Sequence, residues 1–410
     1  MKILILTQYF PPEVGAPQNR LFELATRLKA AGVEITILTA MPNYPWMEIH
    51  KDYLGKKRMV EEMDGLTVHR TSIYVSKSKS IMRRLMNYFS FVWSSFWYGR
   101  KLEADFDYIL CESPPLFLGI SAWLLCKIKK ARLIFNVSDL WPESAEKLGL
   151  VSNKFFLGAA KILEEFLYRK SFLICGQTQG IVQNISSRFP HKKVYWLPNG
   201  VDLKLFSGTP SSDWRIRTGI PEDSFLLIYA GILGHAQGLE IIIKVADKLK
   251  NNSAIHFLIL GSGPLKNDLI ALTKSLAVKN VTFHDAVRKG DMPGILSVCD
   301  ASIIPLKKLD LFKGAIPSKI FEVLAMKKPI LLGVEGEAKE LFIDKGKAGI
   351  YFTPENVDEL EGAIKTLSAD SALCRQLGLN GFNFVAEHFT RDMIANKFLS
   401  YLKELHAMGD

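Results

Sequence analysis

The chain lacks the features that mark several large classes of protein. It has five cysteines in 410 residues, scattered without a C-x-x-C pair, which argues against a disulfide framework or a zinc site and fits a reducing compartment. No apolar run reaches membrane-spanning length, and the apolar stretch Ile3 to Leu6 is too short for a signal peptide. We therefore expect a cytosolic or peripheral protein.

Catalytic signatures are also scarce. The chain has no H-E-x-x-H, no Walker A lysine and no G-x-S-x-G, which leaves metal hydrolysis and Ser/His catalysis poorly supported. The single D-x-D, at residues 105–107, precedes a predicted strand and so lies at the wrong sheet end for a metal–diphosphate site. The glycines of Leu260-Gly-Ser-Gly-Pro264 resemble a dinucleotide fingerprint, but Lys266 replaces the third glycine, and Asp285 is then not a ribose acid.

The first half of the chain has fewer acidic than basic residues. Residues 1–200 contain 27 Lys and Arg against 17 Asp and Glu, whereas residues 201–410 contain 25 of each, so the whole net charge of +10 belongs to the first half. This asymmetry points to an anionic partner such as a phosphorylated acceptor or a membrane surface. Nucleic acid is disfavoured because no recognition motif is present.

Residues 82–101 combine an aromatic-rich run with Arg83-Arg84 before it and Arg100-Lys101 after it. This is the composition of a helix at a membrane interface. An ordinary buried helix is an equal alternative, because the apolar residues nearly encircle the helix.

Short apolar runs alternate with helix-length amphipathic segments along the chain, as expected for βαβ units on parallel sheets. The alternation restarts after the turn-forming sequence Leu197-Pro-Asn-Gly-Val-Asp202. We therefore predict an α/β protein with two Rossmann-like doubly wound domains, at residues 1–200 and 201–390, and a C-terminal helix within 391–410 that can return to the first domain. The predicted strands are 3–6, 33–38, 108–111, 133–137, 226–230, 255–260, 281–283, 301–305 and 330–332.

The segment from Gly314 to Pro329 is the most informative part of the chain. A Pro-Ser turn opens a short helix that carries Lys319 and Glu322. A helix start and a lysine suit a phosphate, and a carboxylate one turn later suits a sugar diol. The segment predicts a nucleotide-sugar site, with solvated surface residues as the alternative.

Ligands of open α/β sheets bind beyond the carboxyl ends of the strands. In the first domain these positions hold Gly15, which permits close approach of a ligand, and the carboxylates Glu112 and Asp139. Either carboxylate could orient or deprotonate an acceptor hydroxyl, although Asp139 could instead cap the next helix. In the second domain the glycine-rich turn 229–239 suits a diphosphate.

Several motifs together resemble the GT-B glycosyltransferases of glycosyltransferase family 4, a retaining family. They are Gln8-Tyr-Phe-Pro-Pro-Glu13, Ser113-Pro-Pro-Leu116, Asp139-Leu-Trp-Pro-Glu143, Pro198-Asn-Gly-Val-Asp202 and Ala236-Gln-Gly-Leu239. The set is similar to the bacterial subgroup that builds O-antigens and capsules, including WbuB-type N-acetylfucosamine transferases. The resemblance implies an acceptor-binding first domain, a second domain that binds a nucleoside-diphosphate sugar, and a metal-free active site in the cleft between them.

The resemblance assigns roles to individual residues. Catalytic roles fall to Asp139, Lys319 and Glu322; acceptor binding falls to Gly15, Glu112, Ser138 and Asp139; donor binding falls to Gly234, Gln237, Gly238, Gly263, Ile316, Ser318, Lys319 and Glu322. The chain also departs from the family pattern, with Gly314 in place of the first of two spaced glutamates, Ile232 and Gln237 in place of an arginine and a lysine, and Ser138 in place of a histidine. Our hypothesis is that Lys319 and nearby backbone amides replace the missing cations.

The implied reaction transfers a sugar, such as N-acetylfucosamine, from a UDP-sugar to an undecaprenyl-diphosphate-linked saccharide. It would take place at the inner face of the cytoplasmic membrane, without a cofactor, a metal or nucleic acid. Two alternatives remain open: a nucleotide-sugar epimerase or hydrolase of the same fold, and a non-catalytic nucleotide-binding membrane adaptor.

Overall fold

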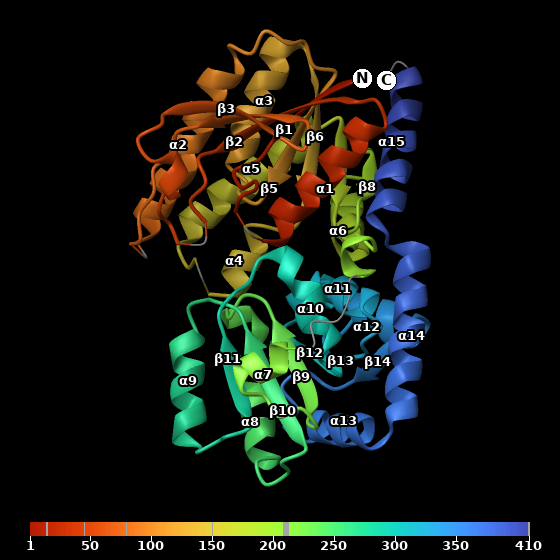
Figure 1. Cartoon of the computed structure of the whole chain (residues 1–410). Helices are drawn as coiled ribbons and strands as arrows, with labels where there is room; N and C mark the ends of the chain where they lie inside the picture. The colour runs from red at the N-terminus through yellow and green to blue at the C-terminus, as the bar shows by residue number, and fades with distance from the viewer. Residues whose placement is uncertain (14, 45, 79, 150, 208–212, 409–410) are drawn as a thin grey trace. The chain divides into compact units, whose positions relative to one another are not determined.

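A computed structural model describes the chain except for residues 14, 45, 79, 150, 208–212 and 409–410 (Figure 1). It divides into two compact units. The first contains Met1–Pro198 and Arg391–Asp410, and the second contains Asn199–Thr390. The last helix, α15 (Arg391–Ala407), thus belongs to the first unit although it follows the second in sequence.

The first unit is built on an eight-stranded sheet in the order β3-β4-β2-β1-β5-β6-β7-β8. All neighbouring strands are parallel except β3 and β4, which pair antiparallel. The strands are β1 (Lys2–Leu6), β2 (Glu34–Ala40), β3 (Arg58–Met63), β4 (Leu66–Thr71), β5 (Tyr108–Ser113), β6 (Arg132–Val137), β7 (Leu173–Gly176) and β8 (Val194–Trp196).

The central strands are apolar runs because both faces of the sheet are covered. The β3–β4 hairpin was not predicted from the sequence. Its turn consists of Asp64 and Gly65, which both have positive φ angles, of 47° and 76°. This is the backbone of a two-residue hairpin turn, and the alternating exposure along β3 marks it as an edge strand.

Helices cover both faces of this sheet. On one face, α1 and α15 pack over alternate strand residues such as Ile3 and Ile5. On the other face, α2, α3, α5 and α6 pack over Leu4 and Leu6. The helices are α1 (Ala16–Ala30), α2 (Ile81–Gly99), α3 (Leu118–Lys129), α4 (Glu143–Lys147), α5 (Lys154–Lys170), α6 (Gln179–Arg188) and α15 (Arg391–Ala407).

The second unit has a six-stranded, fully parallel sheet in the order β11-β10-β9-β12-β13-β14. Its strands are β9 (Phe225–Ala230), β10 (Ile255–Leu260), β11 (Val281–His284), β12 (Ala301–Pro305), β13 (Ile330–Gly333) and β14 (Gly349–Tyr351). Its helices are α7 (Trp214–Thr218), α8 (Glu240–Lys248), α9 (Lys266–Ser275), α10 (Met292–Ser297), α11 (Lys319–Ala325), α12 (Glu337–Lys339), α13 (Val357–Ala369) and α14 (Ser371–His388). The predicted fold class, α/β with two Rossmann-like parallel sheets, is confirmed.

Each sheet reverses its winding direction beside its first strand. In the first unit β1 lies between β2 and β5, and in the second β9 lies between β10 and β12. Such switch points leave a crevice at the carboxyl ends of the strands where ligands bind. The loops after β1, β5 and β6, and those after β9, β10 and β12, therefore carry the candidate ligand-binding residues.

Candidate active site

Lys319 of the second unit points back over the end of β9. Its Nζ atom lies 3.6 Å from the centroid of the Tyr229 ring. It also lies against Gly231, where a Cβ atom would come within 2.9 Å of that nitrogen. The lysine is therefore held at the carboxyl edge of the sheet and does not extend into solvent as an ordinary helix lysine does.

The environment of Lys319 disfavours its charge. Burial lowers the pKa of its ammonium group to about 7, while the nearby Glu322 acts in the opposite direction. A desolvated cation with only partial compensation gains stability when an anion enters its site. Perturbed groups of this kind are concentrated at functional sites.

The glycines after β9 and β10 allow two backbones to touch. A Cβ atom on Gly261 would lie 1.8 Å from the carbonyl oxygen of Gly231, and one on Gly263 would lie 2.4 Å from that of Leu233. Both glycines have φ angles that side chains rarely adopt, +150° and +156°. Gly263, predicted to bind the donor, therefore has a packing role that fixes the loop beside Lys319.

The loop after β9 is also tied to the loop after β12. The Lys307 backbone N–H donates to the Ala236 carbonyl, with an N···O distance of 3.0 Å. Gly238 adopts a left-handed conformation beside Lys307. Of the predicted donor residues, Gly234, Gln237 and Gly238 follow β9, Gly263 follows β10, and Ile316, Ser318, Lys319 and Glu322 follow β12, so all lie in loops or helix starts at the same edge.

Ile316 and Ser318 differ in accessibility within this edge. Ile316 is buried at 8% exposure, so its side chain belongs to the core, whereas Ser318 is partly accessible. Ser318 is the N-cap residue of α11, but its side chain makes no capping hydrogen bond. The Ser318 hydroxyl is therefore not committed to the helix that it precedes.

The residues of the failed dinucleotide motif pair with each other. Lys266 Nζ lies 2.5 Å from Asp285 Oδ1 in an exposed ion pair. Across the part of the chain that the structure describes, no three His, Cys, Asp or Glu side chains gather in a metal-binding group. The Asp105–Asp107 sequence lies before β5, as predicted, and Asp107 accepts a hydrogen bond from the Lys2 backbone.

In the first unit, Arg20 from α1 joins the ends of β5 and β6. Its Nη2 atom lies 2.5 Å from Glu112 Oε1 and 2.6 Å from Ser138 Oγ. The Ser138 hydroxyl donates to the same Glu112 oxygen, and the Asn136 amide donates to Oε2 at 2.5 Å. Both oxygens of the buried Glu112 carboxylate are thus occupied, which suits a positioning residue better than a proton acceptor.

Asp139 follows β6 and keeps a freer carboxylate. Its Oδ2 atom accepts a hydrogen bond of 2.7 Å from the Ser144 hydroxyl. Burial raises its pKa, and the bonds from Ser144 and the Leu140 backbone only partly oppose this. Since α4 has Pro142 as its N-cap residue without a side-chain capping bond, Asp139 is not the cap of that helix.

The loop between β1 and α1 is held by Glu13. This buried carboxylate accepts hydrogen bonds from the backbone N–H groups of Phe10, Asn43 and Tyr44 at 3.1, 2.7 and 2.8 Å. Burial nevertheless raises its pKa to about 7. Gly15 is the N-cap residue of α1, so its position depends on this anchor.

Sequence reasoning missed Arg20, Glu13 and Tyr229. Arg20 had a readable signal, because it lies four residues before Leu24 and eight before Leu28 and so shares the apolar face of α1. A charged side chain on a buried helix face needs a buried partner. The contact of Tyr229 with Lys319 had no such signal, because it joins residues 90 positions apart.

Comparison with known proteins assigns the class. A model for glycosyl transferase 4-like domains matches residues 15–200, and one for glycosyl transferases group 1 matches residues 211–384. Two parallel-sheet domains with these matches define a GT-B glycosyltransferase. The chain belongs to the group 1, family 4-like glycosyltransferases.

Individual relatives and a structural neighbour agree with this family. The chain is 26% identical to Escherichia coli WcaI, named as a colanic acid biosynthesis glycosyl transferase, over 89% of this chain and 91% of the relative. It is 24% identical to the Campylobacter jejuni N-acetylgalactosamine-N,N'-diacetylbacillosaminyl-diphospho-undecaprenol 4-alpha-N-acetylgalactosaminyltransferase, over 74% and 77% of the two chains. Anabaena Alr3699/HepE, solved in complex with UDP-glucose, has the same fold, with a TM-score of 0.73, 17% identity and coverage of 98% and 100%.

None of the helices in the described ranges is long and apolar enough to cross a membrane. The two family matches together identify the chain as a glycosyltransferase.

Proposed function

We propose that the chain is a metal-independent, retaining glycosyltransferase that transfers a sugar from a UDP-sugar to a lipid-diphosphate-linked saccharide. The observation that carries the proposal is the contact of the half-buried Lys319 side chain with Gly231 and Tyr229 at the switch point of the second unit. A partly desolvated lysine beside glycine backbone is suited to a diphosphate, because the anion compensates the desolvated charge.

The proposed reaction balances without a protein nucleophile. The bond between the sugar C1 atom and the diphosphate oxygen breaks, and a bond from C1 to the acceptor oxygen forms on the same face. The acceptor proton passes to the departing diphosphate oxygen. Lys319 stabilises the charge on the leaving group, which is the main electrostatic contribution, and Glu322 binds sugar or ribose hydroxyls.

On the acceptor side we assign Asp139 to orient the acceptor hydroxyl. Its raised pKa and its fixed bond to Ser144 support that role. Arg20 donates hydrogen bonds to Glu112 and Ser138, and these bonds fix the end of β6. Gly15 allows the acceptor to approach the loop after β1.

We propose an undecaprenyl-diphosphate-linked acceptor and a location at the inner face of the cytoplasmic membrane. The Campylobacter relative is named for a diphospho-undecaprenol acceptor, which supports this choice. An N-acetylated 6-deoxyhexosamine such as N-acetylfucosamine is the proposed sugar, in O-antigen or capsule assembly, because Gly314 removes a sugar contact that a deoxy sugar does not need.

The first test is calorimetric titration of the purified chain with UDP, GDP and ADP in EDTA. We expect selective UDP binding, weakened at least tenfold by Lys319→Ala. The matched control is Lys274→Ala, an exposed lysine of α9 in the same unit, which should bind UDP like the unmodified chain. Absence of nucleotide binding, or equal affinity in Lys319→Ala, would contradict the proposed donor site.

A second measurement separates transfer from other reactions of a sugar nucleotide. Incubation with UDP-N-acetylhexosamines, with and without a lipid-diphosphate acceptor, should give UDP at a rate that depends on the acceptor, and an α-linked product from an α-linked donor. UDP release or sugar isomerisation at the same rate without acceptor would instead identify a hydrolase or an epimerase.

A further inference from the structure

One face of α2 exposes a continuous row of large apolar side chains. Met82, Met86, Phe89 and Trp93 are 66%, 48%, 44% and 67% exposed. Their spacings of four, three and four residues place them on one side of the helix. Single exposed apolar residues are normal on a protein surface, but a continuous row indicates an interaction site.

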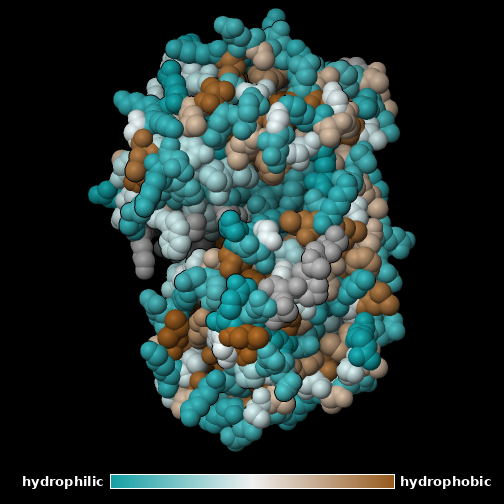
Figure 2. Space-filling view, in the orientation of Figure 1, coloured by the Kyte–Doolittle hydropathy of each residue, from teal (hydrophilic) through white to brown (hydrophobic). Residues whose placement is uncertain are grey.

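The buried face of α2 combines polar and apolar side chains. Asn87 and Ser95 are buried at 2% and 0% exposure, and both are hydrogen-bonded. Asn87 accepts from the Gln8 amide at 3.0 Å, and Ser95 bonds the Ser121 hydroxyl at 2.9 Å. Phe91 lies between them at 0% exposure and packs into the apolar core. The helix therefore has apolar side chains on its outer face in addition to those that pack into the core, whereas surface helices normally have one apolar stripe, facing the core. In Figure 2 hydrophilic side chains predominate on the visible surface, and apolar ones are dispersed.

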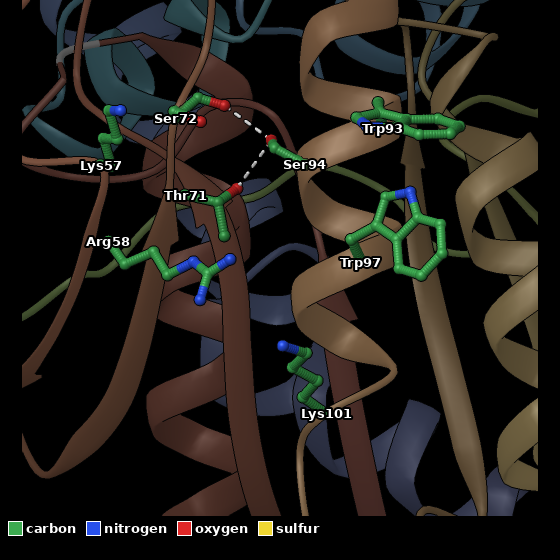
Figure 3. A pocket seen from close by; sticks show the side chains of 8 residues that line it. All are labelled: Lys57, Arg58, Thr71, Ser72, Trp93, Ser94, Trp97 and Lys101. Atoms are coloured by element: carbon green, nitrogen blue, oxygen red, sulfur yellow. Dashed lines mark hydrogen bonds between the residues drawn. The ribbon is translucent and has the colours of Figure 1, made fainter.

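A cationic pocket adjoins the same row. It is a cavity of about 780 Å³ between β3, β4 and α2, lined by Lys57, Arg58, Thr71, Ser72, Trp93, Ser94, Trp97 and Lys101 (Figure 3). Figure 3 shows Arg58 and Lys101 pointing toward each other across the space beside Ser94. Trp93 belongs both to the pocket and to the exposed row, so the two features form one surface.

The three cations of this pocket lack acidic partners. Lys57, Arg58 and Lys101 are all exposed, and in the described part of the chain none forms an ion pair with a carboxylate. At the end of α2, Arg100 stacks over the Trp97 ring at 4.5 Å. Tryptophan and cationic side chains beside an apolar helix face are the groups that anchor proteins at an anionic lipid interface.

We propose that this surface docks on a bilayer of anionic phospholipids, with the apolar row entering the interface and the pocket taking a lipid phosphate group. The inference rests on the membrane location proposed above and names the surface and the ligand class. A second copy of the chain is a poorer occupant, because a symmetric contact would bring the same unpaired cations face to face.

The test is flotation of the full chain with vesicles of phosphatidylcholine, with and without phosphatidylglycerol. We expect binding only with phosphatidylglycerol, and weaker binding as salt is raised. Arg58→Ala/Lys101→Ala should weaken binding about 30-fold, because each cation near the surface contributes about a fivefold factor. Lys397→Ala/Lys403→Ala removes the same charge from the exposed face of α15 and should bind normally.

The apolar row is tested by Phe89→Ser/Trp93→Ser, with Ile216→Ser on α7 of the second unit as the control for an exposed apolar residue. The row variant should lose vesicle binding at unchanged melting temperature, and the control should not. The inference would be overturned if the unmodified chain did not bind phosphatidylglycerol vesicles, or if both double variants bound them as well as the unmodified chain does. It would also be overturned if the chain formed a dimer that only the row variant disrupts. UDP titration of the unmodified chain decides the proposed function separately, since its donor site lies in the other unit.

Discussion

The Lys319 ammonium nitrogen lies 3.6 Å from the centroid of the Tyr229 ring, between a helix start and a strand end that are 90 residues apart in sequence. Desolvation at this position lowers the pKa of the lysine to about 7, and we propose that the site takes the diphosphate of the donor. The charge state of Lys319 should therefore depend on whether a diphosphate is bound.

UDP binding should take up a proton. With a pKa of about 7, Lys319 is mostly neutral at pH 8 in the free chain, and a bound diphosphate raises that pKa. Calorimetry at pH 8 in buffers of different ionisation enthalpy should show uptake of close to one proton, and UDP affinity should fall as the pH rises above 7. In Lys319→Met the uptake should vanish; uptake that persists there belongs to another group.

Lys319→Met should also change how stability depends on pH. The pKa of Lys319 falls from its usual 10.5 to about 7 on folding, so the folded chain binds fewer protons than the unfolded one between those values. Stability therefore rises with pH across this window, and the charged lysine costs stability below pH 7. Urea unfolding at pH 6.5 should show the variant more stable by about 1 to 3 kcal/mol, after allowance for partial exposure. Equal stability at pH 6.5 and pH 9.5 in the unmodified chain would argue against a buried charge.

Gly261→Ala should impair the donor site through the backbone. The added Cβ atom would lie 1.8 Å from the Gly231 carbonyl oxygen at a φ of +150°, so the loop beside Lys319 must move. We expect a loss of about 2 to 4 kcal/mol in unfolding free energy and at least tenfold weaker UDP binding. Gly158→Ala is the control, because its Cβ meets no atom within 4 Å inside α5; it should be neutral or stabilising by up to about 1 kcal/mol.

Removal of Arg20 should leave the buried Glu112 carboxylate without a cationic partner. Arg20→Ala leaves Glu112 without its cation, and breaking a buried pair in this way costs about 3 to 5 kcal/mol. The double variant Arg20→Leu/Glu112→Leu should lose less unfolding free energy than the single variant, yet stay low in turnover because Ser138 has lost its partners. Full turnover in the folded double variant would show that the network has no role beyond stability.

Asp139→Asn should slow transfer without affecting the donor site. The amide retains an oxygen for the Ser144 hydroxyl, but it lacks the negative charge with which the carboxylate accepts a hydrogen bond from the acceptor hydroxyl and orients it. Turnover should fall by about 10²- to 10³-fold, with UDP affinity unchanged. In the unmodified enzyme, turnover should rise with pH through the raised pKa of Asp139. If this rise is absent from the pH profile of the variant, the ionisation belongs to Asp139.

Much of the fold could be predicted from local patterns. Apolar runs such as Ile255–Leu260 became buried parallel strands with little change in their ends, because strands covered on both faces must be apolar throughout. The hairpin of β3 and β4 was missed, since the residues of β3 alternate in exposure at a sheet edge and include Glu61 and Glu62. The edge position of β3 follows from strand order, which no local pattern contains.

The sequence by itself determined the two-sheet architecture and the loops that carry the candidate site, because strand ends and turn residues are local properties. Only the tertiary structure decided what the site residues do. It buried Glu112 between Arg20 and Ser138, which makes it a positioning group. It also placed Lys319 beside Tyr229 in surroundings whose desolvation lowers the lysine pKa. These outcomes depend on desolvation and on contacts between distant segments, and both quantities exist only once the chain has folded.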